Sequence, residues 1–344
     1  MIKTLSTYIL EVPFQNPTTS VIALSYTVKL YVWKGNKSAV PANPIYIFTK
    51  PNPTLSNGID KLDISRQIND FFSIGFTLPT VFNTLVNGNN QAWAKWEIMY
   101  ADTPATVTTT QTHLAVKGYG FYLEGQNAQL PTNRILIDSD EFNVSYNSIF
   151  ILPILLSETL NLGKIEIKSF PGVSLDISLD VNATTNSNEL VKYLFVQPLT
   201  TNSQDEYIQI TFNGFKRLLY LTTECKYEPL DIAFQNRNGA IEIMTFFKSK
   251  KESIAVTKES YKSDIDYQYN ISSKSKFEIN SGWIGEDKNT NVKQLLLSEK
   301  TWAIINNVPV PVLVDTKSLE FKTRVNEKLI NYKIDFSYAF DDIY

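Results

Sequence analysis

The chain has one histidine and one cysteine, His113 and Cys225, the residue types best suited to acid–base and nucleophilic chemistry. No Gly-x-Ser-x-Gly elbow or acid at a fixed spacing accompanies His113. Cys225 follows a predicted strand, a position typical of a buried and inert thiol. A single residue of each type also excludes disulfide frameworks within the chain, most zinc sites and catalysis by a Cys–His pair. We therefore expect neither residue to be catalytic.

Acidic residues are densest at Asp138, Asp140 and Glu141, which makes this cluster a candidate calcium site. The cluster lacks the Asp-x-Asp-x-Asp-Gly pattern of a dedicated loop, so a solvated turn is the favoured interpretation. Residues 341–342 are expected to form a solvated end. Carboxylate pairs that hydrolyse glycosides have no signature here, and both glycine-rich phosphate-binding motifs are absent. We expect no enzymatic activity, no cofactor and no metal ion.

Basic and aromatic residues suggest binding surfaces. The run Lys248-Ser-Lys-Lys251 could contact nucleic acid, but a solvated strand end or a salt-bridging rim at an interface is the favoured interpretation. The five tryptophans could include a platform that stacks on sugars. Aromatic side chains are also the usual anchors of cores and protein interfaces, which is the alternative that we favour.

Composition bounds the kinds of protein that this chain can be. It has 344 residues, 43% of them hydrophobic, and a net charge of −3. This hydrophobicity excludes intrinsic disorder, and the charge gives no basic surplus for specific nucleic-acid binding. No segment approaches the roughly 20 apolar residues of a membrane helix. The N-terminal segment is interrupted by polar residues, so we expect a first strand there, no secretory signal, no membrane contact and synthesis in a cytoplasm.

Strict alternation of apolar and polar residues, the signal of a half-buried strand, recurs along the chain. Together with the many Val, Ile, Thr, Tyr and Phe residues, it predicts a mostly β protein built from antiparallel β-sandwich or jelly-roll-like domains with about twenty strands. The clearest examples are residues 23–33, 93–100, 165–168, 173–181, 207–212 and 330–340.

Helix signals are few and short. Residues 291–299 are the best candidate, followed by 65–72, which Asp63 or Ser65 could cap, and by 80–86. Three of the four Asn-Gly pairs predict turns, at residues 57–58, 213–214 and 238–239, and the fourth, at 87–88, ends the helix candidate at 80–86. The pair at 238–239 lies between two apolar runs and is a strong hairpin signal.

Three regions follow from these patterns. We expect an N-terminal β domain with short helices at 1–128, a central β-sandwich at 129–228, and a C-terminal β domain with one short helix at 229–344. Because no proline-rich or Gly/Ser-rich linker separates the regions, we expect the domains to abut.

The last third of the chain carries a family resemblance. A Phe-x-Asn-Arg-x-Gly hairpin at 234–239, a Lys-x-Leu-Leu-x-Ser-Glu helix at 293–299 and a terminal strand at 328–339 follow one another in this order. This series resembles virion structural proteins of tailed bacteriophages that infect Bacteroidetes, including the crAss-like phages. The resemblance covers 225–344 well and 60–72 weakly, and its motifs carry no catalytic residue.

The resemblance implies a subunit of a homo-oligomeric ring in the tail, collar or tail-hub region of a virion, in contact with other tail or neck proteins. Unpaired sheet edges can pair with another chain, and we expect such edges at the subunit contacts, with Trp283 or Trp302 as aromatic anchors. The alternative is a glycan-binding or host-adhesion β-sandwich module, which requires exposed aromatic residues beside Asn and Asp in a groove.

Overall fold

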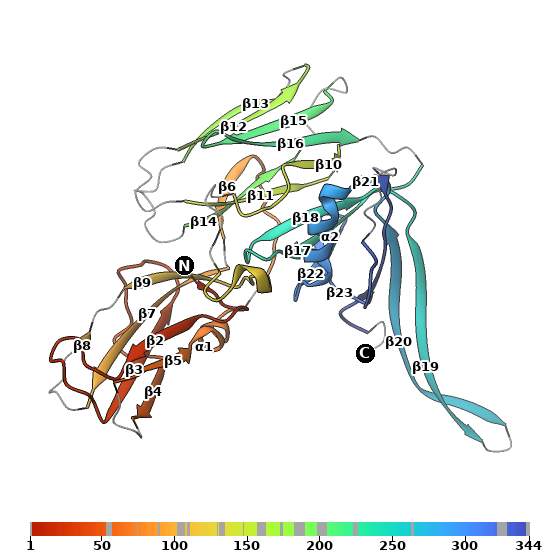
Figure 1. Ribbon diagram of the computed structural model, residues 1–344. Coiled ribbons are helices and arrows are strands. Elements are labelled where there is room, and N and C mark those ends of the chain that lie inside the picture. The colour runs from red at the N-terminus through yellow and green to blue at the C-terminus, as the bar shows by residue number, and fades with distance from the viewer. Residues whose placement is uncertain are drawn as a thin grey trace.

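Strands dominate the computed structural model, shown as a ribbon in Figure 1, and this confirms the predicted mostly β fold with a few short helices. None of the helices among the described residues is long and apolar enough to span a bilayer. The structure describes residues 2–52, 57–73, 75–88, 90–101, 107–108, 111–128, 130, 135–146, 148–156, 163–172, 175–181, 190–197, 205–222, 226–262, 265–321 and 329–341.

The N-terminal part forms a six-stranded sheet and a two-stranded sheet around one core. In the larger sheet β1 pairs with β9 in parallel and the other pairs are antiparallel. The helix α1 begins at Ser65, as predicted, but the residue at its N-cap is Ile64 and no side chain caps the helix, so the predicted cap is wrong. The backbone N–H of Ser65 donates to the carboxylate of Asp63 (3.0 Å). The elements are β1 (Ile2–Lys3), β9 (Thr112–Val116), β7 (Gln91–Tyr100), β3 (Ser25–Trp33), β4 (Tyr46–Pro51) and β8 (Val107–Thr108), then β2 (Ile9–Pro13), β5 (Ile59–Asp63) and α1 (Ser65–Asn69).

Two sheets lie over one another in the middle part (Figure 1). In the five-stranded sheet, Asn213 and Gly214 both have positive φ, and they form the predicted tight turn between β15 and β16. The five strands are β10 (Glu141–Ser145), β16 (Phe215–Thr222), β15 (Tyr207–Phe212), β12 (Gly163–Phe170) and β13 (Asp176–Val181). The three-stranded sheet consists of β11 (Phe150–Leu155), β14 (Val191–Val196) and β6 (Thr84–Asn87).

The C-terminal part is a seven-stranded antiparallel sheet with a helix against it. The helix α2 (Asn289–Leu296) confirms the best helix prediction and buries Val292 and Leu295 in the core of this sheet. The strands are β18 (Ile241–Phe246), β17 (Leu230–Gln235), β22 (Thr301–Ile305), β23 (Val308–Val314), β25 (Lys333–Tyr338), β20 (Asp266–Asn280) and β19 (Lys251–Lys262), beside the short pair β21 (Ile284–Gly285) and β24 (Leu329–Ile330) and the 3₁₀ turns η1 (Tyr122–Glu124) and η3 (Glu286–Lys288).

The predicted helix at 80–86 is wrong. This segment holds the strand β6, which pairs with β14 through Leu85 and Leu194. Asn83 has a φ of +56°, in the left-handed region that a right-handed helix excludes. Pairing with a strand far along the chain therefore outweighs the weak helical pattern.

One large core runs through all three parts. It includes Trp93 from the N-terminal sheet, Phe150 and Phe212 from the two middle sheets, and Ile241 and Trp302 from the C-terminal sheet. In Figure 1 the N-terminal sheet and the long hairpin β19–β20 extend away from this shared body as two diverging legs.

Candidate assembly surfaces and the three-way junction

The predicted hairpin at 234–239 connects β17 to β18 and lies where the three parts meet. The side-chain oxygen of Asn236 accepts hydrogen bonds from the backbone N–H groups of Asn238 (3.0 Å) and Ala240 (3.1 Å). Gly239 adopts a φ of +76°, a conformation that favours glycine. The Asn and Gly of the motif are therefore needed for the shape of the loop.

The hairpin approaches the N-terminal part at backbone distance. The N–H of Tyr119 donates to the carbonyl of Arg237 (2.8 Å), and the side-chain amide of Gln235 donates to the carbonyl of Lys117. A Cβ atom added at Gly239 would lie 2.9 Å from the carbonyl carbon of Lys117, and one added at Gly118 would lie 2.5 Å from the carbonyl oxygen of Arg237. Only glycine fits at either position without a shift of the backbone.

The guanidinium of Arg237 joins the hairpin to the middle part. Its Nε donates to Oδ2 of Asp138 (2.7 Å) and its second terminal nitrogen to Oδ1 (3.1 Å), while the other terminal nitrogen pairs with Glu124. Arg237 also lies over the ring of Phe121 (5.3 Å), and Lys293 lies over the same ring (4.2 Å). The arginine of the motif is thus the centre of an ionic cluster.

The acidic cluster is divided between partners. Asp138 pairs with Arg237, Asp140 pairs with Arg217 (2.7 Å), and the hydroxyl of the intervening Ser139 donates to an asparagine of α2. Within the described part of the chain no group of three or more His, Cys, Asp or Glu side chains could hold a metal ion. Asp138 and Ser139 therefore join the middle part to the C-terminal part, whereas Asp140 pairs within the middle part.

Two further carboxylates are fully buried at this junction. Glu242 on β18 accepts from Asn236 (3.1 Å) and from Asn291, and burial raises its pKa to about 7. Asp231 on β17 accepts from the hydroxyls of Thr245 (2.6 Å) and Ser148 (2.9 Å), and burial raises its pKa to about 6. Both residues sit in alternating strand segments, so no sequence signal distinguishes them from exposed acids.

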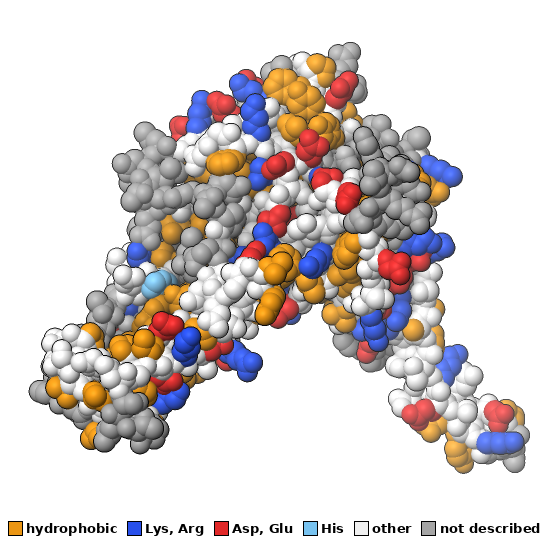
Figure 2. Space-filling view, viewed as in Figure 1, with side chains coloured by type: hydrophobic (Ala, Val, Ile, Leu, Met, Phe, Trp, Pro, Cys, Tyr) orange, Lys and Arg blue, Asp and Glu red, His pale blue; other side chains and the backbone are white. Residues whose placement is uncertain are grey.

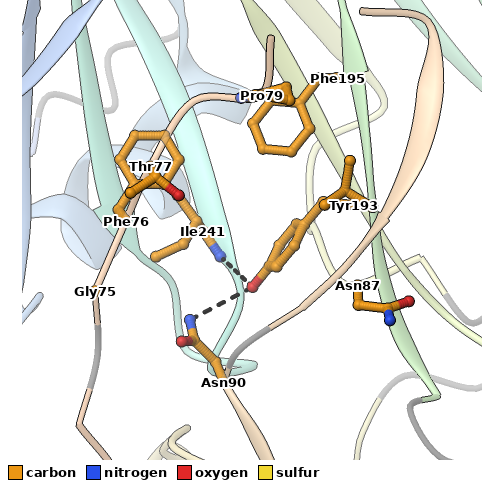
Figure 3. Close-up of a pocket in the computed structure, with 10 residues that line it drawn as sticks. Gly75, Phe76, Thr77, Pro79, Asn87, Asn90, Tyr193, Phe195 and Ile241 are labelled. Atoms are coloured by element: carbon orange, nitrogen blue, oxygen red, sulfur yellow. Dashed lines mark hydrogen bonds between the residues drawn. The ribbon is translucent and has the colours of Figure 1, made fainter. Parts of the chain in front are cut away.

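A small cavity beside the junction is shown in Figure 3. The hydroxyl of Tyr193 accepts from the side-chain amide of Asn90 (3.4 Å) and from the backbone N–H of Ile241 (3.2 Å) at one side of it. Phe76 and Phe195 are among the other residues that line the cavity. Its volume is about 90 Å³, and pockets for small molecules usually have roughly 300–1,000 Å³. The cavity accommodates a few water molecules.

The ring of His113 stacks on Trp96, with 4.5 Å between the centroids and 4° between the planes. Tyr8 packs at 6.4 Å, and burial lowers the pKa of His113. His113 therefore packs between aromatic side chains of the N-terminal part. Cys225 lies outside the described residues.

Of the two tryptophans expected at subunit contacts, Trp302 is buried in the shared core against Phe76 (5.4 Å). The prediction for Trp302 is therefore wrong, because this side chain fills the space between sheets. Trp283 is 65% exposed. The other three tryptophans, Trp33, Trp93 and Trp96, are buried as well.

The basic run at 248–251 leads into β19 and forms a rim of ion pairs. Lys250 pairs with Glu252 (2.5 Å) and lies over the ring of Phe277 (5.1 Å), and Lys251 pairs with Glu278 (3.7 Å). The two lysines thus have acidic partners at a strand end, and whether this rim lies at an interface stays a prediction.

A long exposed feature of the fold is the outer part of the hairpin β19–β20, here called the arm (residues 254–262 and 265–275). Beyond Lys276, β20 no longer pairs with β25, so the arm continues as a two-stranded ribbon. Figure 2 shows its hydrophobic side chains facing solvent. The large exposed ones are Ile254 (59%), Val256 (45%), Tyr261 (61%), Ile265 (67%), Tyr267 (58%), Tyr269 (50%) and Ile271 (43%).

A β-bulge divides the arm. Between the pairs Thr257–Ser272 and Glu259–Tyr269, β19 has one residue and β20 has two, one of which is Asn270 with a φ of +49°. An extra residue changes the face on which the following side chains lie. Apolar side chains therefore occupy one face of the arm before the bulge and the opposite face after it.

Beyond the bulge, three tyrosines form the tip face. Tyr261 and Tyr267 are direct cross-strand partners, and Tyr269 lies two residues along on the same face. The opposite face of the tip carries the polar pair Ser260 and Gln268. The alternation of apolar and polar residues at 267–271 predicts a strand. A strand whose apolar face packs on the core of its own domain has the same pattern, so the sequence does not reveal that this face is exposed.

Comparison with known proteins adds no relative: neither a protein-family model nor a curated protein matches this chain.

Proposed function

We propose that this chain is a structural subunit of a tailed-bacteriophage virion, and that it forms a homo-oligomeric ring in the tail, collar or tail-hub region beside other tail or neck proteins. The arm carries the proposal. A two-stranded ribbon is marginally stable in water by itself, and large apolar side chains on such a ribbon gain stability when another surface covers them. Tyrosine is also enriched at the centres of protein interfaces.

The phage resemblance supports the same proposal through the residues that carry it. The hairpin motif at 234–239 connects three sheet systems, and the helix motif supplies Glu299, which pairs with Lys117 of the N-terminal part (2.9 Å). Such motifs fix the positions of the three parts relative to one another. We expect this in a subunit that must present its contact surfaces in fixed positions to form a larger assembly.

Every buried ionisable side chain described at the junction has hydrogen-bond or ion-pair partners within the protein. Glu242 and Asp231 are enclosed by protein donors, and Arg237 is occupied by two carboxylates. A substrate would have to displace these partners to reach the carboxylates. The geometry therefore favours assembly over hydrolysis.

The test is the mass of the purified protein in solution, measured by light scattering over a concentration series. We expect a closed oligomer whose mass stays constant once assembly is complete, visible as rings by electron microscopy. A mass of one chain at every concentration would contradict self-assembly.

Glycan binding is the second candidate, because the tip face offers three exposed tyrosines on which sugars could stack. Binding to a glycan panel should then be lost in a variant with Tyr267→Ser and Tyr269→Ser. Failure of the unaltered protein to bind any glycan of the panel would refute this candidate.

A further inference from the structure

The carboxyl group of Glu242 is enclosed where the middle part meets the C-terminal part. It accepts hydrogen bonds from the side-chain amides of Asn236 (3.1 Å) and Asn291. Both asparagines also bind the middle part: Asn236 donates to the carbonyl of Leu136 (2.6 Å), and Asn291 accepts from the hydroxyl of Ser139. The carboxyl group is therefore connected to the middle part through each of its two partners.

The groups around Glu242 do not neutralise a charge on it. Its two donors are neutral amides, and among the described side chains no lysine or arginine forms an ion pair with it. Two charged groups act from a greater distance: the carboxylate of Asp138, which is paired with Arg237, opposes ionisation, and the ammonium of Lys288 favours it. The phenol of Tyr119 also faces the site. Such surroundings favour the neutral form of a fully buried acid.

A small cavity lies beside Asn291, between β10 of the middle part and β18. Its volume is about 40 Å³, which is sufficient for a water molecule, and Phe142, Ile243 and Lys288 are among the residues that line it. Asn291 lines the cavity and also binds Glu242. Rotation of this one side chain therefore brings water from the cavity to the carboxyl group.

We propose that the contact between the middle and C-terminal parts is a pH-sensitive latch, closed while Glu242 carries a proton and loosened when Glu242 ionises. Ionisation adds a negative charge near that of Asp138, in a site without a cation partner. Opening of the contact lets water reach both carboxylates, so the charged form of Glu242 favours the open arrangement. The latch acts within one chain and does not depend on the proposed ring.

The size of the effect follows from the linkage between proton binding and opening. Burial raises the pKa of Glu242 from 4.5 to about 7 in the closed form, so the opening equilibrium constant should rise about tenfold between pH 6 and pH 8. Burial raises the pKa of Asp231 from 3.8 to about 6, so this residue titrates mostly below that range and should add a factor of about two.

The test is hydrogen–deuterium exchange of the full chain at pH 6 and pH 8, measured by mass spectrometry and corrected for the intrinsic exchange rates. Three chains are compared: the unaltered protein, Glu242→Gln, and the control Asp231→Asn, which removes the other buried carboxylate of the same contact. Peptides that cover 135–145 and 286–296 report on the latch, and a peptide that covers β3 reports on the N-terminal sheet.

We expect protection of the latch peptides to fall about twentyfold from pH 6 to pH 8 in the unaltered chain, about tenfold in D231N and only about twofold in E242Q. Protection of β3 should stay constant in all three chains. An equal fall in E242Q and the unaltered chain would overturn the proposal, as would an unaltered chain whose latch protection does not change with pH. The same fall in β3 would indicate global unfolding and would overturn it too. Should E242Q fail to fold, D231N still decides, because loss of the pH dependence in that variant would assign it to Asp231.

Discussion

Replacement of Glu242 by glutamine tests whether the junction contains a carboxyl group with a raised pKa. Burial raises this pKa from 4.5 to about 7 in the folded chain. The carboxyl group binds its proton more tightly in the folded state, so its contribution to stability is full below pH 4.5 and is lost as the pH rises through 7. The difference of about 2.5 pKa units corresponds to about 3 kcal/mol.

Glutamine preserves the shape of the side chain and cannot ionise. Its amide can be accommodated if the Asn291 side chain rotates, because the hydroxyl of Ser139 can accept as well as donate a hydrogen bond. We therefore expect the difference in unfolding free energy between the E242Q variant and the unaltered chain to grow in favour of the variant as the pH rises. The growth should amount to about 3 kcal/mol between pH 4.5 and pH 8. The pH dependence that remains should come partly from Asp231, whose pKa is also raised.

The assay is urea unfolding followed by tryptophan fluorescence, at four pH values from 5 to 8. An E286Q variant, which changes an exposed glutamate, is the control and should follow the unaltered chain at every pH. A constant difference in unfolding free energy between E242Q and the unaltered chain across this range would refute the reasoning.

Two other predictions concern the junction. The substitution Gly239→Ala should lower the unfolding free energy by at least about 2 kcal/mol, because the added methyl group meets the backbone of Lys117 and the φ of this residue is positive. Gly214 has a similar φ but open space around it, so Gly214→Ala should lower the unfolding free energy by only about 1 kcal/mol. Both values come from the same urea titration. Replacing Arg237 by methionine should destabilise the fold by about 2 kcal/mol at low salt, and by less at 1 M salt, as measured by the unfolding midpoint, because the ion pair with Asp138 is partly exposed. Equal costs at the two glycines, or a salt-independent effect at Arg237, would contradict these arguments.

Local patterns in the sequence were sufficient for much of the fold. The Asn213-Gly214 turn and the hairpin at 234–239 follow from residues that adopt positive φ easily, and α2 follows from its spacing of apolar residues. These features depend on neighbours in the chain, which the sequence displays directly.

Features that depend on distant partners could not be predicted in this way. Glu242 and an exposed glutamate have the same local pattern, and only the approach of Asn291 and the middle part buries the former. Trp302 is buried because Phe76 and the middle sheets cover it. The arm is the opposite case: the alternation around Tyr267 and Tyr269 predicts side chains buried on a core, and in the structure both side chains are exposed.

The strand β6 imposes an order of events on synthesis of the chain. Asn87 at its end is 105 residues before its neighbour Lys192 on β14. At 5–20 residues per second, a ribosome needs roughly 5 to 20 seconds to make this stretch. Leu85 therefore leaves the ribosome well before its partner strand exists, and the three-stranded sheet is complete only after β14 (Val191–Val196), more than half-way along the chain, has been made. A fragment that starts after Asn87 would lack this strand from the outset.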